Sequence, residues 1–260
     1  MGIKVHPDWW KTLFDGMYLR TDARSVCDDD LTNREVDVIC DLLKLRKGDS
    51  LLDLCGGQGR HSLALAQRGY DRCTVIDFSP HLVAMGRKSA REGNNTVRFI
   101  QGDARDTGLA RESFDHVIIM GNSLGYLPEA DDDARIMAEA FRVLKPGAGI
   151  MVDVTDGERV LSEMVPNAWH VVDEDLVVCR EREVEDGTVR AREMIFSRRK
   201  GLVRDQAYAI RLFRTHQLEE LLERAGFGTI SIRRDFSPHD AEGDYGFMNR
   251  RIIATGLKPA

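Results

Sequence analysis

Hydrophobic positions along the chain form three zones: a helical start, an alternating middle and a strand-rich end. Residues 7–45 carry apolar side chains at helical spacing, in the order Val36, Ile39, Cys40, Leu42 and Leu43. Residues 31–33 offer an N-terminal cap for this helix, and residues 47–49 end it. We therefore expect a helical segment in front of the main fold.

Short apolar runs alternate with amphipathic segments between residues 50 and 154. The apolar runs predict strands that are buried on both faces, at 50–54, 72–76, 97–100, 116–120 and 150–154. The amphipathic segments predict helices at 60–68, 80–91 and 134–144, with Ser79 as the cap of the second helix and Gly93 at its end. This alternation favours parallel strands joined by right-handed crossovers, which is an α/β fold.

Hairpin signals replace the helices after residue 155. Asp186-Gly187 is typical of a two-residue turn, so facing residues would have numbers that add up to 373. That register forms three opposite-charge pairs, which are Glu183 with Arg190, Glu181 with Arg192, and Arg180 with Glu193. Lys200-Gly201 predicts a second turn, and residues 169–212 therefore predict three or four antiparallel strands.

The last part of the chain returns to one helix and two strands. Helical spacing covers residues 216–225, with Thr215 as the expected cap and Gly226 at the end. Strands are predicted near 229–233 and 251–255.

Composition narrows the classes of function. The chain has 260 residues, a net charge of -6 and no basic stripe, which argues against binding to nucleic acid. It has no run of about 20 apolar residues, so we expect no membrane span. Its five cysteines are scattered and form no CxxC pair, which favours reduced thiols in a cytoplasm and no metal site.

A glycine-rich turn, residues 55–59, follows the first predicted strand. Glycines let a ligand approach the backbone, and the next helix presents free N–H groups. Asp77 ends the second strand, 20 residues beyond Gly57, where nucleotide-binding folds place a carboxylate on ribose hydroxyls. Ser62 stands where a dinucleotide fingerprint has a third small residue. Spacing alone therefore leaves a dinucleotide and S-adenosylmethionine both open.

A series of motifs in order resembles the class I S-adenosylmethionine-dependent methyltransferases. They are Asp53-Leu54-Cys55-Gly56-Gly57-Gln58-Gly59, Val75-Ile76-Asp77-Phe78-Ser79-Pro80, Gly102-Asp103-Ala104, Phe114-Asp115 and Leu144-Lys145-Pro146-Gly147. Bacterial small-molecule enzymes with a helical lid are similar at Phe14-Asp15-Gly16-Met17-Tyr18-Leu19, Gly59-Arg60-His61, Ser123-Leu124-Gly125-Tyr126 and Arg211-Leu212-Phe213. Cys55 departs from the pattern, because many relatives have glycine there. A small side chain is tolerable there if its φ angle is negative, so we expect binding to survive.

The resemblance implies a Rossmann-like seven-stranded sheet with two additions. Residues 1–46 would form an N-terminal helical lid, and residues 47–155 with 215–260 the cofactor-binding domain. Residues 156–214, after the fifth strand, would form an antiparallel β insertion that covers the substrate pocket. The insertion could also carry a homodimer.

The resemblance also implies a role for each cofactor-binding residue. Asp53 and the backbone of Cys55, Gly56, Gly57 and Gly59 would hold the methionine part of S-adenosylmethionine, and later of S-adenosylhomocysteine. At the adenosine part, Asp77 would bind the ribose, Phe78 would pack on the adenine, and Asp103 beside Ala104 would accept from the adenine amino group. The Gly121-Asn122 backbone would meet the methionine amino group, and Tyr18 would close over the cofactor. Either Arg60 or Arg20 could bind the cofactor carboxylate.

Methyl transfer depends mainly on alignment, and a base is needed only if the acceptor must lose a proton. The predicted catalytic residue is Tyr126, and His170 and His216 are further candidates for a base. The predicted substrate-binding residues are Tyr126, Trp169, His170 and Arg211. The many arginines of the insertion suit an anionic acceptor, whereas Trp9 and Trp10 are expected to pack the N-terminal helix.

The predicted function is methyl transfer from S-adenosylmethionine to a small molecule at N, O or C. Three alternatives stay open at this point: a methyltransferase of RNA or protein, an NAD-dependent oxidoreductase, and a non-catalytic binding subunit on the same fold. The fourth predicted strand ends in Gly121-Asn122-Ser123-Leu124, which does not resemble the signature of amino-methylating nucleic-acid enzymes.

Overall fold

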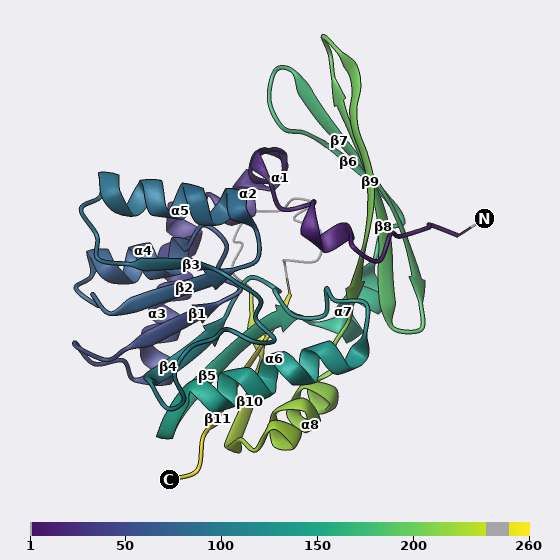
Figure 1. Ribbon diagram of the computed structural model, residues 1–260. Coiled ribbons are helices and arrows are strands. Elements are labelled where there is room, and N and C mark those ends of the chain that lie inside the picture. Colours follow the sequence, from purple (N-terminus) through teal and green to yellow (C-terminus); the bar gives the residue numbers. More distant parts are fainter. Residues whose placement is uncertain (1, 238–249) are drawn as a thin grey trace.

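Two β-sheets and the helices between and around them make up the protein in the computed structural model (Figure 1), which describes residues 2–237 and 250–260. The larger sheet has seven strands in the order β10-β11-β5-β4-β1-β2-β3. These strands are β1 (Leu51–Leu54), β2 (Cys73–Asp77), β3 (Arg98–Gln101), β4 (Phe114–Ile119), β5 (Leu144–Thr155), β10 (Gly228–Phe236) and β11 (Arg251–Leu257). Strands β1 to β5 are parallel, and β11 is antiparallel to both of its neighbours. The predicted seven-stranded α/β sheet is confirmed.

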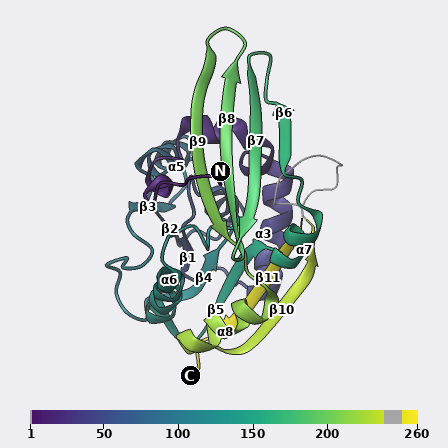
Figure 2. The ribbon, with the colours of Figure 1, turned by 90° about the vertical axis from the view of Figure 1, so that its right-hand side faces the viewer.

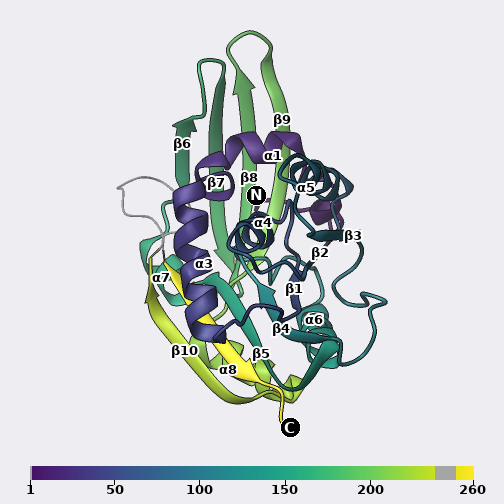
Figure 3. The ribbon, with the colours of Figure 1, turned by 90° about the vertical axis from the view of Figure 1, so that its left-hand side faces the viewer.

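Helices cover both faces of this sheet, and each face has its own core. Helices α3 (Asp29–Leu43), α4 (Arg60–Gln67) and α5 (Pro80–Glu92) pack on one face, where Leu51, Val75 and Met151 are buried. Figure 3 shows α3 lying along that face. Helices α6 (Ala130–Val143) and α8 (Thr215–Ala225) pack on the other face with Leu52 and Ile76. Both faces are buried, which explains why the strands read as continuous apolar runs.

The second sheet is antiparallel and has four strands in the order β6-β7-β8-β9, seen face-on in Figure 2. Its strands are β6 (Asn167–Val171), β7 (Leu176–Glu185), β8 (Thr188–Ser197) and β9 (Gly201–Arg211), and α7 (Gly157–Glu163) precedes them. The hairpin of β7 and β8 has the predicted register, with all three charge pairs directly opposite one another. Burial alternates along β7 and β8, so one face is covered and the other is open.

The N-terminal segment lies between the two sheets (Figure 1). It contains a short 3-10 helix, η1 (Trp9–Lys11), and the helices α1 (Gly16–Thr21) and α2 (Ala23–Val26) before α3. Asp15 caps α1, because its side chain accepts hydrogen bonds from the backbone N–H groups of Met17 and Tyr18.

Several predicted element ends are wrong. Asp28 caps α3, not residues 31–33: its side chain accepts from the Leu31 N–H, and Leu31 itself is buried. Helix α8 begins at Thr215, which is therefore not its cap, and the Gln217 side chain accepts from the Arg214 N–H instead.

Helix α6, which we predicted over residues 134–144, also begins earlier than expected, at Ala130. Its first turn holds three aspartates, whose charge favours a helix N-terminus: Asp131, Asp132 and Asp133. Residues 145–147 lie between the predicted helix 134–144 and the predicted strand 150–154. They belong to β5, because Leu144 already pairs with Phe114. No helix in the described residues is long and apolar enough to span a membrane.

Candidate active site

A cavity lies at the carboxyl ends of β1, β2 and β4, which is where ligands bind in open α/β sheets. The N-terminal segment and the inner face of the second sheet complete its wall. Predicted site residues that line it are Tyr18, Asp53, Cys55, Gly56, Gly57, Asp77, Phe78, Asp103, Ala104, Gly121, Asn122 and Tyr126. The structure therefore brings most of the predicted site together.

The glycine-rich turn leaves no room for a side chain at Gly56 or Gly59. A Cβ atom on Gly56 would lie 2.5 Å from Cγ of Asp53, and one on Gly59 would lie 2.6 Å from the Phe99 ring. Gly57 and Gly59 also have positive φ angles, 58° and 72°, which favour glycine. Gly59 does not line the cavity, so its role here is to let α4 pack closely on Phe99.

Cys55 adopts a left-handed conformation with a φ angle of 62°. This overturns the condition of a negative φ under which we expected a side chain to be tolerated. A non-glycine residue in this region costs about 1–2 kcal/mol. The turn therefore stores backbone strain next to the cavity, as functional sites often do.

Two buried carboxyl groups face the glycine-rich turn. Asp77 accepts from the Gly57 N–H through Oδ2 and from the Ser79 N–H through Oδ1, both at 2.8 Å, and burial raises its pKa. Asp53 accepts from the Ser62 hydroxyl at 2.9 Å, and burial raises its pKa to about 7. The other oxygen of Asp53, Oδ1, is buried and has no hydrogen-bond partner among the described residues.

An arginine that sequence reasoning missed occupies the carboxylate of Asp103. Arg105 donates to Asp103 from Nε (3.0 Å) and Nη2 (2.7 Å), and from Nη1 to Asp132 (3.0 Å). These hydrogen bonds lower the pKa of Asp103 despite its partial burial. Trp10 lies over the same region, edge-on to Phe78 at a ring distance of 4.5 Å.

Hydrogen bonds to β5 fix the turn that follows β4. Gly121 and Asn122 both have positive φ angles, 70° and 60°. The Asp153 carboxylate accepts from the Gly121 N–H (3.1 Å), and the Asp153 carbonyl accepts from the Asn122 N–H (3.1 Å). The Asn122 side chain accepts in turn from the Thr155 N–H (2.8 Å). This turn presents its backbone to the cavity in one fixed geometry.

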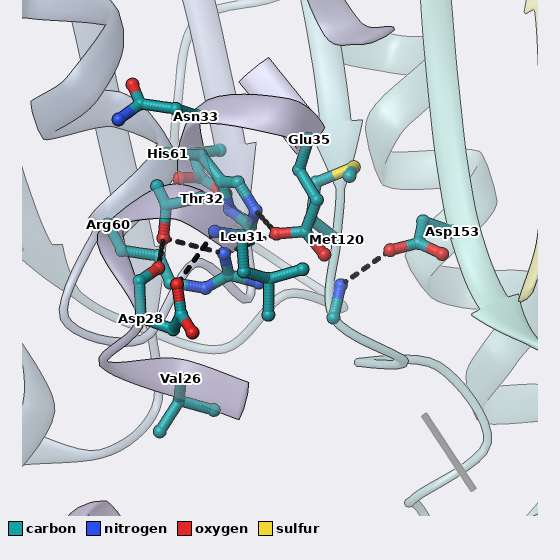
Figure 4. A network of polar contacts seen from close by, with 12 residues as sticks. Val26, Asp28, Leu31, Thr32, Asn33, Glu35, Arg60, His61, Met120 and Asp153 are labelled. Atoms are coloured by element: carbon teal, nitrogen blue, oxygen red, sulfur yellow. Dashed lines mark hydrogen bonds and ion pairs between the residues drawn. The ribbon is translucent and has the colours of Figure 1, made fainter. Parts of the chain in front are cut away.

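Asp153 belongs to a buried ion cluster that joins four elements: Glu35 of α3, Arg60 and His61 of α4, Asp153 of β5 and Arg251 of β11. Arg251 is fully buried, and its Nε donates to Asp153 at 2.6 Å. Its Nη2 lies 3.5 Å from Glu35, which also pairs with Arg60. Figure 4 shows the contacts around Glu35 and the hydrogen bond that Asp153 accepts from the backbone N–H of Gly121.

The charges of the buried ion cluster balance. Burial lowers the pKa of His61 to about 4, so this ring is neutral and hydrogen-bonds to Glu35 at 2.9 Å. Burial alone would raise the pKa of Glu35, but Arg60 and His61 hold it well below its usual range. Two carboxylates therefore face two guanidinium groups. The sequence carries one signal of this cluster, since Glu35 interrupts the apolar helix face between Leu31 and Ile39.

An aromatic chamber forms the remaining wall of the cavity: Trp9, Phe14, Tyr18, Tyr126 and Tyr208. The Trp9 ring lies 5.6 Å from Tyr126 and 5.8 Å from Tyr208, and the Phe14 ring lies 5.0 Å from Tyr18. Trp9 and Trp10, which we expected to pack the N-terminal helix, both line the cavity. Burial raises the pKa of the Tyr126 phenol, which therefore stays protonated at neutral pH.

Three predicted substrate-binding residues do not line the cavity. Trp169 is 68% exposed on the edge strand β6, where alternate side chains point away from the covered face. His170 hydrogen-bonds to the Thr21 carbonyl at 3.2 Å. Arg211 pairs with Asp133 and donates to the Leu127 carbonyl, so it ties β9 to α6 and the loop before it.

Two other candidates also lie outside the cavity. Arg20 pairs with Asp173 at 2.6 Å on the surface, whereas Arg60 lines the cavity. His216 is exposed on α8.

Comparisons of the sequence with known proteins show which family the chain is similar to. Residues 51–147 match a methyltransferase domain model. The glycine/sarcosine N-methyltransferase of Parasynechococcus marenigrum (strain WH8102) is 30% identical over 262 aligned residues, covering 94% of this chain and 85% of that protein. The putative methyltransferase YqeM of Bacillus subtilis (strain 168) is 27% identical over 191 residues, 72% of this chain and 76% of that protein.

Solved structures share the fold at low sequence identity. An S-adenosylmethionine-dependent methyltransferase from Clostridium acetobutylicum ATCC 824 superposes with a TM-score of 0.72 at 19% identity, over 90% of this chain and 93% of that one. The sugar N-methyltransferase KedS8 from Streptoalloteichus sp ATCC 53650 superposes with a TM-score of 0.71 at 19% identity, over 100% and 99% of the two chains.

The chain belongs to the class I S-adenosylmethionine-dependent methyltransferases. This membership decides between the two ligands that motif spacing had left open, in favour of S-adenosylmethionine over a dinucleotide.

Replacing Arg251 by methionine is expected to lower the free energy of unfolding by about 3–5 kcal/mol, because the change leaves Asp153 and Glu35 buried without their shared cation. Urea denaturation measures the loss. Arg192→Met is the control, since Arg192 pairs with Asp205 on the open face of the second sheet and its loss should change stability little. Equal effects of the two changes would contradict the central position of Arg251.

Replacing Cys55 by glycine is expected to leave stability unchanged or raise it by up to about 1 kcal/mol. Relief of the left-handed strain outweighs the larger backbone entropy that glycine has in the unfolded chain. Urea denaturation is again the measurement. A loss of more than about 1 kcal/mol would mean that packing of the Cys55 side chain outweighs its strain.

Proposed function

We propose that the protein transfers a methyl group from S-adenosylmethionine to a small molecule held in the aromatic chamber. The observation that carries this proposal is the enclosure of the chamber by residues from the N-terminal segment, the loop after β4 and the second sheet. A wall of this kind suits a small acceptor better than an RNA or protein surface, and the net charge of -6 also disfavours RNA. The names of two similar proteins agree with this proposal, because glycine, sarcosine and sugars are small acceptors.

The residues present fit the methionine part of the cofactor. The buried Oδ1 of Asp53 has no partner among the described residues, and a carboxylate suits the cofactor's amino group. The glycines of the turn have no side chains that would keep a ligand from the backbone, and the Gly121-Asn122 turn lies at the same cavity. Of the two candidates for binding the cofactor carboxylate, we favour Arg60, because it lines the cavity and Arg20 does not.

The adenosine part would lie between Asp77, Phe78 and Asp103. Asp77 keeps lone pairs for ribose hydroxyls after accepting from two backbone N–H groups. Phe78 is 37% exposed and offers its ring to the adenine, under Trp10. Asp103 would accept from the adenine amino group while Arg105 holds the carboxylate in place.

When bound, S-adenosylmethionine supplies a methyl group on a sulfonium, which is already a good leaving group. The task of the chain is therefore to orient the acceptor and to exclude water. Tyr126 stays protonated, so we infer that it donates a hydrogen bond to the acceptor and does not act as a base.

We propose that residues 1–46 act as a lid and residues 156–214 as the cover of the substrate pocket. Phe14 accepts from the Ser79 hydroxyl (2.6 Å) through its carbonyl, which ties the segment to the cofactor-binding sheet. On the other side, Gln206 of β9 donates to the Thr12 hydroxyl (3.1 Å), and Arg204 pairs with Asp15. The part of this segment that precedes α3 thus contacts both sheets, through these polar contacts and through the rings of Trp9 and Phe14.

A homodimer through the insertion and a cytoplasmic location also stay proposals. Trp169 and Val171 are exposed on β6 and would be covered in such a dimer. All five cysteines are free thiols, which supports a reducing compartment.

S-adenosylhomocysteine is expected to raise the melting temperature, and Asp77→Ala should remove most of that shift because the ribose loses its acceptor. Differential scanning fluorimetry checks this. Asp71→Ala, an exposed acid before the same strand, is the matched control and should keep the shift. A melting temperature of the wild-type protein that S-adenosylhomocysteine does not raise would contradict the assignment of the cofactor site.

Affinity for S-adenosylhomocysteine is expected to rise about tenfold between pH 6 and pH 8. The pKa of Asp53 is about 7, so its carboxyl is mostly neutral at pH 6 and ionised at pH 8, when it attracts the cofactor's amino group. Isothermal titration calorimetry at both pH values measures the change. Asp53→Asn should abolish this pH dependence, and a variant that keeps it would show that another group titrates.

A further inference from the structure

Two strands of the second sheet and the N-terminal segment bring an ion triad to the aromatic chamber. The triad consists of Arg180 on β7, Glu193 on β8 and Asp22 at the end of α1, and all three line the cavity. Arg180 donates from Nε to Glu193 (2.8 Å) and from Nη2 to both oxygens of Asp22 (3.0 and 3.1 Å). Arg180 and Glu193 are only 7% and 3% exposed, so water screens their charges little.

The triad carries a surplus of negative charge, because two carboxylates share one guanidinium group. The sequence had suggested the opposite, since the insertion is rich in arginine. The other arginines on this face of the sheet are engaged elsewhere: Arg204 pairs with Asp15, and Arg182 donates to the Val165 carbonyl. Within the triad itself, carboxylates outnumber guanidinium groups by two to one.

The aromatic rings beside the triad favour the same sign of ligand charge. Tyr208 lies on β9, close enough to Arg180, Glu193 and Asp22 for their charges to act on its phenol. Its ring packs against Trp9. Faces of Trp, Tyr and Phe attract cations, and the attraction grows when the site is desolvated. Acids and ring faces together form a site for an organic cation.

We propose that the acceptor is a protonated amine, which the carboxylates of Asp22 and Glu193 and the rings of the aromatic chamber recognise. This inference rests on the proposed function and adds the chemical class of the acceptor. An anionic acceptor is disfavoured at the triad, because it would have to displace a carboxylate from Arg180.

The triad also offers a destination for a proton. An ammonium group must lose one N–H proton before its nitrogen has a lone pair for methylation. Burial raises the pKa of Glu193 and outweighs the opposing effect of Arg180, and the charge of Asp22 raises it further. Glu193 is thus the carboxylate suited to receive that proton, whereas Tyr126 and Tyr208 keep theirs.

The test compares three probes of the same shape and different charge on the protein saturated with S-adenosylhomocysteine: benzylammonium, benzyl alcohol and benzoate. Isothermal titration calorimetry at pH 7.5 measures each affinity without any turnover. We expect benzylammonium to bind at least about tenfold more tightly than benzyl alcohol, and benzoate most weakly. Equal binding of the three, preference for benzoate, or no binding of benzylammonium would overturn the proposal.

Two variants assign the effect to the triad. Glu193→Gln should weaken benzylammonium about tenfold and leave benzyl alcohol unchanged. Glu181→Gln is the control, because Glu181 lies on the open face of β7 and should change neither. An unchanged preference in Glu193→Gln would overturn the role of the triad.

Binding of S-adenosylhomocysteine separates this inference from the proposed function. Failure of the wild type to bind it would defeat the proposed function, whereas binding without a preference for the cation defeats only the amine. If Glu193→Gln fails to bind it and is thus misfolded, Asp22→Asn takes its place with the same expected loss. The comparison of probes on the wild type decides the charge class even without a variant.

Discussion

The pairing of Arg251 with Asp153 and Glu35 is the constraint on which the site depends. Burying a guanidinium group completely is costly unless carboxylates and hydrogen bonds surround it. Strand β11 runs antiparallel to β5, so its first residue lies at the carboxyl edge of the parallel strands, where Arg251 meets Asp153. One oxygen of Asp153 then fixes the Gly121 N–H, and Glu35 fixes Arg60 and α3. The last strand of the chain thus organises loops that belong to its first half.

Features that follow from local patterns could be predicted from the sequence. The strands β1 and β2 and the turn after β1 are continuous segments, and their ligand-facing groups lie at strand ends by topology. The register of β7 and β8 followed from a two-residue turn, because such a turn leaves only one pairing, and the charge pairs agreed with it. For these elements, residues close in sequence decide the structure.

Features that depend on distant partners could not be predicted. Trp169 and His170 are neighbours on β6, and only the position of the sheet decides that Trp169 is exposed while His170 reaches Thr21. The positive φ of Cys55 is imposed by the geometry of the turn, although the residue type disfavours it. Arg211 lies at a matching family position, yet a carboxylate of α6 takes up its charge.

The two halves of the proposed reaction site therefore differ in how the sequence encodes them. The cofactor half draws on motifs at the ends of neighbouring parallel strands, so their order along the chain reveals it. The acceptor half draws on Trp9, Tyr126, Glu193 and Tyr208, which come together only when the second sheet closes over the first. Counting the arginines of the insertion does not give the charge of its inner face, because each arginine must be counted with its partner. We propose that the pairing of charges on the inner face of the second sheet, and not the number of arginines, sets which acceptor the site favours.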